Sequence, residues 1–231
     1  MFWSECRKRY SSIGTSDPDI KRYLNVSSEI QQEGYSGCLS FIQDMGHKYV
    51  ATHTAIGSTL EIGFGRGRQD IFYKGHVDNY FPTDISTTYV TMETWKKYKN
   101  ATIADAMSLP YPEECFDQVV SIYNLEHIVN VVEVFSEVKR VMKPKGRFVV
   151  ALPCEGGFAW NAGRTLTTRR AFSRKYGIDY DKVIAYEHKH NLKEIINLLD
   201  SHFSKVHSRY YPFLLPLLDI NLIYCGIYTH P

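Results

Sequence analysis

The sequence predicts an α/β fold in which a mostly parallel sheet is covered by helices on both faces. From Thr59 onward, short apolar runs alternate with longer amphipathic segments, which is typical of strands joined by helical crossovers. A glycine-rich turn directly follows the first of these runs. Near the end of the chain two strand-like runs lie close together, and such a pair favours an antiparallel edge on the sheet.

The predicted strands are short runs of mainly apolar residues, as buried parallel strands are. Five runs form the predicted parallel part: Thr59–Ile62, Tyr80–Pro82, Ala101–Ile103, Phe116–Ile122 and Gly146–Leu152. Two later runs form the predicted antiparallel pair: Lys205–Tyr211 and Asn221–Tyr228.

Amphipathic helices are expected between and before the strands. In Val131–Met142, apolar side chains recur at three- and four-residue spacing, which places them on one helical face. Lys143-Pro144-Lys145-Gly146 is the predicted stop, because proline cannot continue a helix and glycine permits a turn. Further helices are predicted near Leu192–Ser201 and in the first fifty residues, which have a break at Gly34-Tyr35-Ser36-Gly37 and would cap the sheet or cover the site.

The composition is that of an ordinary globular domain. Of 231 residues, 44% are hydrophobic, which is enough apolar side chain for one sizeable core. The 27 basic residues nearly balance the 25 acidic ones, so no nucleic-acid partner is expected. No repeat or linker divides the sequence. A single domain over residues 1–231 is therefore predicted, with a helical cap in 1–55 and an insertion in 154–190 on the acceptor side of the site.

Cysteine usage and the start of the chain favour a reduced, cytoplasmic protein. The five cysteines are scattered, odd in number and never spaced as C-x-x-C, which indicates neither a disulfide framework nor a zinc site. Met1–Arg9 reaches charged residues before any apolar run, so no signal peptide is expected. The most apolar stretch, Tyr210–Tyr224, is too short to span a bilayer and contains two prolines.

The glycine turn Gly63-Phe64-Gly65-Arg66-Gly67 is the first candidate for ligand binding. Open parallel sheets bind ligands beyond the carboxyl ends of their strands, and glycines let the backbone approach a ligand closely. A helix is expected to follow the turn and to present free N–H groups. Arg68 occupies the position of the third glycine of a dinucleotide fingerprint, which counts against NAD. A tight turn without a ligand is the alternative.

Asp84 is the second candidate because it ends the second predicted strand. An acid about 20 residues after the first glycine of the turn is typical of a residue that holds ribose hydroxyls. Asp84 meets that spacing from Gly63. Its alternative role is to cap a helix that begins near Ser86.

Four segments in order resemble the motifs of class I S-adenosyl-L-methionine (SAM)-dependent methyltransferases. They are Leu60–Gly67, Asp84, Ala104-Asp105-Ala106 and Phe116–Val120. The best resemblance is to the type 11 methyltransferase group, which has a segment similar to Asn124-Leu125-Glu126-His127-Ile128 after its fourth strand. The resemblance covers roughly residues 59 to 152. It implies a Rossmann-like, three-layer α/β/α fold with a seven-stranded, mostly parallel sheet whose last strand is antiparallel.

The resemblance also implies how SAM is bound and S-adenosyl-L-homocysteine (SAH) is released. It places Glu61, Gly63, Phe64, Gly65 and Gly67 at the methionine end, Asp84 with Ile85 at the ribose, Asp105 with Ala106 and Met107 at the adenine, and the polar Asn124 beside the donor. A carboxylate can accept a hydrogen bond from the exocyclic amine of adenine, and a small neighbour leaves room for the ring. A loop or cap role is the alternative for Asp105.

Three histidines are the candidate general bases: His127, His188 and His190. A sugar hydroxyl needs a base to take its proton, whereas a neutral amine does not, and histidine titrates near neutrality. The alternative for His127 is a helix-start residue bonded to the backbone. The two histidines in Glu187-His188-Lys189-His190 also suggest a metal site as an alternative. No partner carboxylate is specified by the sequence, so no metal is predicted.

Acceptor chemistry is indicated by the insertion after the fifth parallel strand. It holds a basic cluster, Arg164, Arg169, Arg170, Arg174 and Lys175, which could bind a phosphorylated acceptor or form a solvated helix face. Glu33–Gly37, Gly156–Trp160 and Tyr211–Phe213 resemble segments of type 11 methyltransferases found with bacterial surface-polysaccharide assembly.

We therefore expect O-methylation of a small acceptor, a sugar or a surface-polysaccharide precursor. A methyltransferase acting on RNA or protein and a non-enzymatic SAM-binding protein are the alternatives. The sequence leaves the oligomeric state open.

Overall fold

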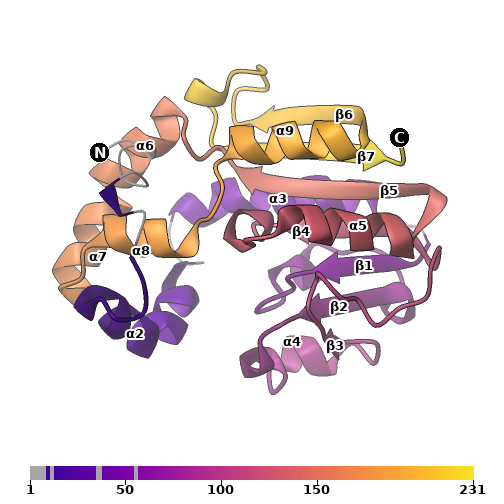
Figure 1. Ribbon diagram of the computed structural model, residues 1–231, viewed down its shortest axis with the longest axis horizontal. Helices are drawn as coiled ribbons and strands as arrows, with labels where there is room; N and C mark the ends of the chain where they lie inside the picture. Colours follow the sequence, from indigo (N-terminus) through magenta and orange to yellow (C-terminus); the bar gives the residue numbers. More distant parts are fainter. Residues whose placement is uncertain (1–8, 11–12, 35–37, 55–56) are drawn as a thin grey trace.

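A seven-stranded sheet organises the computed structural model, which describes residues 9–10, 13–34, 38–54 and 57–231 (Figure 1). The strand order is β3-β2-β1-β4-β5-β7-β6. The five strands from β3 to β5 in this order are parallel, and β7 is antiparallel to both of its neighbours. The predicted Rossmann-like sheet is confirmed. Its strands are β1 (Thr59–Ile62), β2 (Tyr80–Asp84), β3 (Thr102–Ile103), β4 (Phe116–Ile122), β5 (Met142–Pro153), β6 (Ser204–Tyr211) and β7 (Ile223–Thr229).

The predicted antiparallel pair forms one edge of the sheet, with β7 next to β5 and the largely exposed β6 outermost. One detail of the sheet differs from the sequence prediction. Strand β5 begins at Met142 and not at Gly146, because Met142 already pairs with Phe116 and the residues of the predicted helix stop continue the strand.

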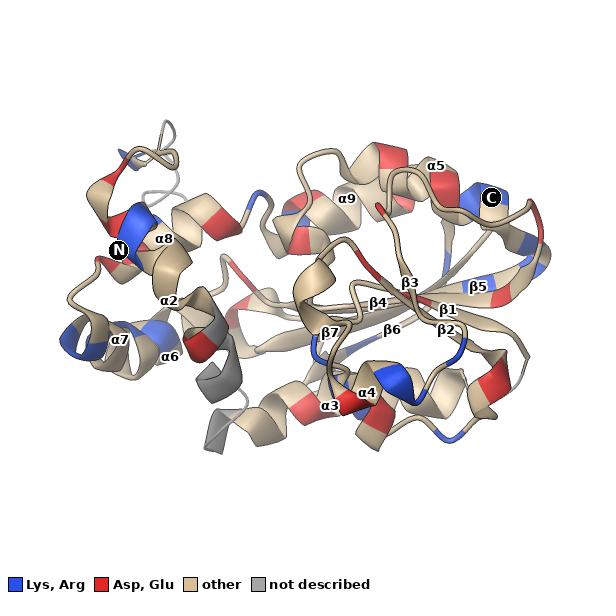
Figure 2. Ribbon diagram, turned by 90° about the horizontal axis from the view of Figure 1, so that it is seen from below, with Lys and Arg blue, Asp and Glu red and all other residues tan. Residues whose placement is uncertain are grey.

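Helices cover both faces of the sheet, as predicted (Figure 2). On one face, α3 (Cys38–His53) packs on β4, β5 and β7 and buries Tyr49 and Val50. On the other face lie α5 (Val131–Val141) and α9 (Leu192–His202). The apolar side of α5 is buried at the predicted three- and four-residue spacing: Val131, Val134, Phe135, Val138 and Val141.

A separate helical lobe lies beyond the carboxyl ends of the parallel strands (Figure 1). It consists of α2 (Pro18–Gly34), α6 (Phe158–Leu166), α7 (Thr168–Tyr176) and α8 (Tyr180–Glu187). Its small core is buried and apolar, formed by Ile20, Tyr23, Phe172, Ile178 and Val183. The two helices of the predicted N-terminal cap are therefore divided, since α2 joins the lobe and α3 covers the sheet. The predicted break at Gly34–Gly37 falls mainly on residues outside the described part.

The helix predicted after the glycine turn is wrong. Described residues 63–79 contain two short 3-10 turns, Arg68–Ile71 and Val77–Asn79, and no α-helix. The connection to β2 is short and carries Lys74-Gly75, which leaves little room for an amphipathic helix. The four-residue helix α4 (Glu93–Lys96) instead packs beneath the turn. No helix among the described residues is long and apolar enough to cross a membrane.

Candidate active site

A pocket of about 230 Å³ lies at the carboxyl ends of the central strands. Most of the predicted donor-binding residues line it: Gly63, Asp84, Ile85, Asp105, Ala106, Met107 and Asn124. The sequence reasoning missed the other lining residues, which are Ile62, Thr83, Ala104, Ile128 and Val129. Because β1, β2, β3 and β4 are parallel neighbours, the residues that follow each of them meet at one edge of the sheet.

The glycine turn wraps over the end of β2. The amides of Gly63 and Phe64 both donate to the carbonyl of Thr83, at 2.9 Å. Gly63 has a φ of +78°, and a Cβ there would overlap the side chain of Asn124. Gly65 also has a positive φ of +53°, but nothing lies within 4 Å of its missing Cβ. One side of the turn is therefore open for a ligand to approach the backbone.

Asp84 connects the glycine turn to the segment after β2. Its Oδ2 accepts from the amide of Gly65 at 2.9 Å, and its Oδ1 accepts from the amide of Ser86 at 2.8 Å. The side chain of Ser86, and not that of Asp84, caps the short 3-10 turn that follows. Each carboxylate oxygen retains a second lone pair, so Asp84 can hold the turn and still accept from a ligand.

Asp105 organises the third corner of the pocket. Its Oδ1 accepts from the amide of Met107 at 2.9 Å, and this turn presents Ala106 and Met107 to the pocket. The carbonyl of Asp84 accepts from the amide of Ala104 at 3.0 Å, which joins the ends of β2 and β3. Asp84 and Asp105 therefore rim the same pocket. Asp105 has the local turn role that was its alternative, and it remains available to a ligand.

Four of the predicted donor-binding residues, Glu61, Phe64, Gly65 and Gly67, do not line the pocket. The side chains of Glu61 and Phe64 lie beneath the turn. The Glu61 carboxylate is buried and accepts a hydrogen bond from the hydroxyl of Tyr80. Burial raises the pKa of Glu61 to about 8, against the lowering effect of the Tyr80 hydrogen bond. Phe64 packs in a buried aromatic cluster with Tyr80, Trp95 and Tyr98.

Helix α4 supports the turn from below. The indole Nε1 of Trp95 donates to the carbonyl of Gly65 at 2.7 Å. The hydroxyl of Thr94 donates to the carbonyl of Arg66 at 3.0 Å, and it also occupies the space that a Cβ of Gly67 would need. These supports were missed by the sequence reasoning, because Trp95 lies about thirty residues from the turn with no local signal.

Two of the three predicted bases come together at the edge of the helical lobe. The rings of His127 and His188 meet edge to face with centroids 4.7 Å apart. His127 lies in the 3-10 turn Leu125–His127 after β4, and His188 follows α8. His190 is held elsewhere, with Nε2 at 3.2 Å from the carbonyl of Val129 and Nδ1 at 3.8 Å from Glu194.

The environments of these two histidines favour opposite protonation states. Burial by itself would lower the pKa of His188, but the adjoining carboxylate of Glu155 raises it. His127 keeps 39% of its side chain exposed, and its Nδ1 lies 3.2 Å from the carbonyl of Glu187. Desolvation together with the His188 ring lowers the pKa of His127. The protonated form is therefore favoured for His188, and the neutral ring for His127, relative to a free imidazole.

A set of buried charged residues surrounds this histidine pair. Glu126 and Glu155 are 3% and 1% exposed, and they follow β4 and β5. Arg164 reaches inward from α6, with Nη1 at 3.9 Å from Glu155 Oε1 and Nη2 at 3.9 Å from Asp181 Oδ1. Burial raises the pKa of Glu126 to about 7. No sequence pattern indicates Glu155 or Asp181, because each is a lone acid far along the chain from its partner.

The predicted basic cluster is divided by the fold. Arg164 is buried, and Arg169 pairs with Asp181 at 2.5 Å. Lys175 pairs with Glu29 of α2 at 3.4 Å. Arg170 and Arg174 face solvent on α7, where basic residues are visible in Figure 2. In the described part of the chain, no group of three or more His, Cys, Asp or Glu side chains is arranged to hold a metal ion.

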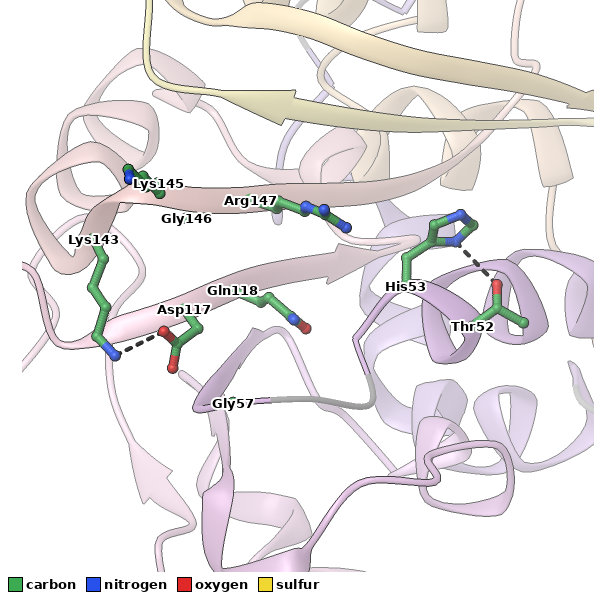
Figure 3. A pocket seen from close by; sticks show the side chains of 9 residues that line it. All are labelled: Thr52, His53, Gly57, Asp117, Gln118, Lys143, Lys145, Gly146 and Arg147. Carbon is green, nitrogen blue, oxygen red and sulfur yellow. Dashed lines mark hydrogen bonds and ion pairs between the residues drawn. The ribbon is translucent and has the colours of Figure 1, made fainter.

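A second cavity, of about 530 Å³, lies at the amino ends of the central strands, away from the predicted donor site (Figure 3). It is lined near the start of β4 and β5 by residues that include Asp117, Lys143, Lys145 and Arg147. Lys143 is already paired with Asp117 at 2.8 Å. This cavity shares no lining residue with the pocket of the predicted donor site.

The pocket at the carboxyl edge has the groups that an adenosine-containing donor requires. Carboxylates at Asp84 and Asp105 can accept from ribose hydroxyls and from the adenine amine. Ile85, Met107 and Val129 supply apolar surface for the flat ring. The open side of Gly65 permits close approach of the rest of the donor. The residues present therefore fit SAM.

Comparison with known proteins agrees with this geometry. Residues 60–150, which run from β1 into β5, match the methyltransferase domain family of type 11. A sterol 24-C-methyltransferase of Neurospora crassa is 24% identical over 152 residues, covering 56% of this chain and 40% of that protein. The chain spans less than half the length of the curated relatives it matches.

Solved structures share the fold over nearly the whole chain. A protein of Pyrococcus horikoshii OT3 superposes with a TM-score of 0.56 at 17% identity, covering 97% of this chain and 99% of that one. A 1,6-didemethyltoxoflavin-N1-methyltransferase of Burkholderia thailandensis, with SAH bound, gives a TM-score of 0.59 at 13% identity, covering 91% and 86%. The family match identifies a type 11 methyltransferase domain in residues 60–150, and the two solved structures share the fold that surrounds it.

Proposed function

We propose that the chain is an enzyme that transfers a methyl group from SAM to a hydroxyl of a small acceptor, a sugar or a surface-polysaccharide precursor. The observation that carries this proposal is the position of the donor pocket next to buried charged side chains of both signs, the acids Glu126 and Glu155 and the base Arg164. Asn124 lines the pocket, and Glu126 and His127 follow it in the same turn. Donor and acceptor would therefore meet beside the 3-10 turn Leu125–His127.

The chain's contribution to the reaction is to bind and orient both partners. When bound, SAM supplies a methyl group that its sulfonium already activates. Asp84 would hold the ribose and Asp105 the adenine, with Met107 packed on the ring. Holding the reactants in line supplies much of the rate of such a displacement. The helical lobe stands over the carboxyl edge of the sheet, where it would exclude water from the reacting groups (Figure 1).

The charges around the histidine pair favour an uncharged polar acceptor. Arg164 already faces Glu155 and Asp181, and Arg169 pairs with Asp181. Neither arginine presents an excess positive charge for a phosphate. Hydroxyl groups donate and accept hydrogen bonds together, which suits a set that holds carboxylates and a guanidinium side by side. The phosphorylated acceptor expected as one option therefore gains no support from these two residues.

Calorimetric titration of the full chain with SAH tests the donor assignment, with NADH titrated in parallel. We expect SAH to bind and NADH not to bind. Asp84→Asn should weaken SAH binding roughly 10- to 100-fold, because hydrogen bonds to a charged acceptor are lost. Asp78→Asn is the matched control, since Asp78 is an exposed acid that pairs with Lys99 away from the pocket. Equal SAH affinity in both variants would contradict the assignment.

Methyl transfer to a panel of simple sugars tests the acceptor assignment separately. Uptake of methyl by RNA or by protein and not by sugars would favour the macromolecular alternative. Tight SAH binding with no transfer to any acceptor would favour a SAM-binding protein without turnover. The cytoplasm is the compartment we propose, and Cys115, Cys154 and Cys225 are free thiols, as a reducing compartment allows.

A further inference from the structure

Four side chains from four segments meet between the sheet and the helical lobe. Glu126 follows β4, Glu155 follows β5, Arg164 belongs to α6, and His188 follows α8. We call these four residues the buried polar set. The exposed fraction of the side chain is 3% for Arg164, 1% for Glu155 and 13% for His188. The set is assembled by the tertiary fold and stands at the carboxyl edge where the acceptor would enter.

Several polar atoms of this set are buried without a hydrogen-bond partner. They are Oε2 of Glu126, Oε1 of Glu155, and Nε and Nη1 of Arg164. Native proteins seldom bury polar groups unpaired, because each one loses its hydrogen bonds to water. Here acceptors and donors are left over side by side. A ligand with several adjacent hydroxyls would satisfy both kinds, since each hydroxyl donates one hydrogen bond and accepts others.

Each predicted histidine base has a partner on at least one ring nitrogen. His188 is held by the Glu155 carboxylate, which favours its protonated form. His127 uses Nδ1 on the carbonyl of Glu187 and has Nε2 4.0 Å from Glu126 Oε1, and His190 uses Nε2 on the carbonyl of Val129. Glu126 differs, because its backbone is fixed while its Oε2 is unused. Its carbonyl accepts from the amides of Lys189 at 2.6 Å and His190 at 3.3 Å.

We propose that Glu126, through Oε2, takes the proton from the acceptor hydroxyl, and that Glu155 and Arg164 hold neighbouring hydroxyls of the same acceptor. This inference rests on the proposed function. In the step, the acceptor O–H bond breaks and its proton goes to Glu126. The acceptor oxygen gains the methyl group, and the products are a methyl ether and SAH. Glu126 then returns its proton to solvent. His188 is a positioning residue that holds Glu155.

The charged groups around Glu126 suit this role near neutral pH. His127 faces it from the same turn, with Nε2 at 4.0 Å from Oε1, and His188 and Glu155 face it from α8 and β5. Burial is the main cause that raises the pKa of Glu126 to about 7, and His188 opposes the rise. Transfer to a hydroxyl should therefore increase with pH through neutrality, as Glu126 loses its proton.

The test uses the full chain with SAM and a panel of methyl glycosides of hexoses and 6-deoxyhexoses, with histamine as the amine probe. Wild type is compared with Glu126→Gln, Glu126→Asp and the control Glu133→Gln, an exposed acid on α5. Three quantities are measured: SAH affinity by calorimetry, kcat and KM against pH, and the titration of the Glu126 carboxyl by carbon NMR. Glu126→Gln removes a buried charge, so we expect it to fold, and thermal unfolding checks this.

We expect at least one glycoside to be methylated. Glu126→Gln should keep the wild-type SAH affinity, lower kcat by roughly 100-fold or more, and lose the rise of kcat with pH. Glu126→Asp should retain the pH dependence with a reduced kcat, and Glu133→Gln should match wild type. The Glu126 carboxyl should titrate near neutrality in the free chain.

The contrary outcomes separate the two proposals. Wild-type chain that does not bind SAH would mean that the proposed function is wrong. SAH binding with methylation of histamine alone, or of no glycoside, would overturn the hydroxyl acceptor and this inference with it. Glycoside methylation that Glu126→Gln leaves at the wild-type rate and pH profile would overturn only the role of Glu126. A Glu126 carboxyl that titrates at its ordinary 4.5 would do the same.

Discussion

Glu61 and Glu126 are both buried carboxyls near the donor pocket, yet their partners differ. Glu61 lies under the glycine turn and receives the hydroxyl of Tyr80. Glu126 faces the histidine pair and keeps an oxygen without a partner. A buried acid with its hydrogen bond satisfied serves the structure, whereas one left unsatisfied is available to a ligand. Burial of Glu61 lowers the stability of the fold when its carboxyl is ionised, so this cost depends on pH.

Glu61→Gln should remove that pH dependence. Because burial raises the folded-state pKa of Glu61 from 4.5 to about 8, its protonated form is favoured in the fold. Wild-type stability should therefore fall as pH rises from about 4.5 to 8, by on the order of 5 kcal/mol from this group. An amide can still accept from Tyr80. Thermal unfolding at pH 5 and pH 9 compares the two proteins, and equal losses in both would contradict the assignment.

Gly63→Ala should damage the donor pocket. An alanine at the φ of +78° is strained, and its Cβ would overlap the side chain of Asn124. We expect a loss of about 1–2 kcal/mol in the free energy of unfolding from the strain alone, together with weaker SAH binding because Asn124 must move. Gly177→Ala is the matched control, since Gly177 has a φ of +63° with nothing within 4 Å. A similar loss of SAH affinity in both variants would show that the effect is not local.

At the scale of elements, the short helix α4 supports the glycine turn in place of the long helix that was expected to follow it. The glycine turn is followed by the 3-10 turn Arg68–Ile71, so no long helix N-terminus stabilises it. Helix α4, which follows β2 in the chain, stabilises the turn instead. Trp95 donates a hydrogen bond to the carbonyl of Gly65, and Thr94 donates one to the carbonyl of Arg66. The aromatic cluster of Phe64, Tyr80, Trp95 and Tyr98 then fixes α4 to the turn.

Trp95→Phe should loosen the glycine turn while keeping most of the aromatic packing. Loss of the indole bond to the Gly65 carbonyl should lower SAH affinity roughly 2- to 10-fold, which corresponds to one ordinary hydrogen bond. Tyr98→Phe is the control, because it removes a hydroxyl bonded to Asp70 and leaves the turn untouched. The SAH affinity of both variants is measured by calorimetry. An unchanged affinity in Trp95→Phe would mean that α4 does not set the shape of the donor site.

At the scale of the whole molecule, helix α2 is held within the helical lobe by charge as well as by apolar packing. Lys182 of α8 lies 3.0 Å from Asp17 Oδ2 and 2.9 Å from Asp19 Oδ2. These two hydrogen bonds raise the pKa of Lys182. Ile20 and Tyr23 of α2 are buried among lobe side chains. Helix α2 is therefore attached to the other lobe helices and not to the sheet.

Lys182→Met should release α2 without affecting the donor pocket. We expect faster amide hydrogen exchange in residues 18–34, because the two ion pairs at the start of α2 are lost, and unchanged SAH affinity, because no lobe residue lines the pocket of the donor site. Lys21→Met, at an exposed position of α2, should leave exchange unchanged. Hydrogen exchange followed by mass spectrometry gives the comparison. Unaltered exchange in Lys182→Met would show that apolar packing alone holds α2.

Much of the fold and of the donor site follows from the sequence by itself. The alternation of apolar runs predicts the strands, and parallel connections bring their carboxyl ends to one edge. Gly63 directly follows β1, Asp84 ends β2 and Asp105 lies two residues after β3, so local order along the chain is enough to place them in one pocket. The antiparallel pair β6 and β7 also follows from local order, because these two strands are neighbours in sequence.

The tertiary structure alone decided the rest of the site. Glu126, Glu155, Arg164 and His188 meet only because four separate segments converge at the helical lobe. The same convergence turned Arg164 inward to acids, left Arg170 and Arg174 in solvent, and gave each histidine its partner. The support of the glycine turn by Trp95 also spans about thirty residues. Local patterns determine which backbone forms where, but the environment of a charged side chain depends on neighbours that are distant in sequence, and only the packed fold supplies them.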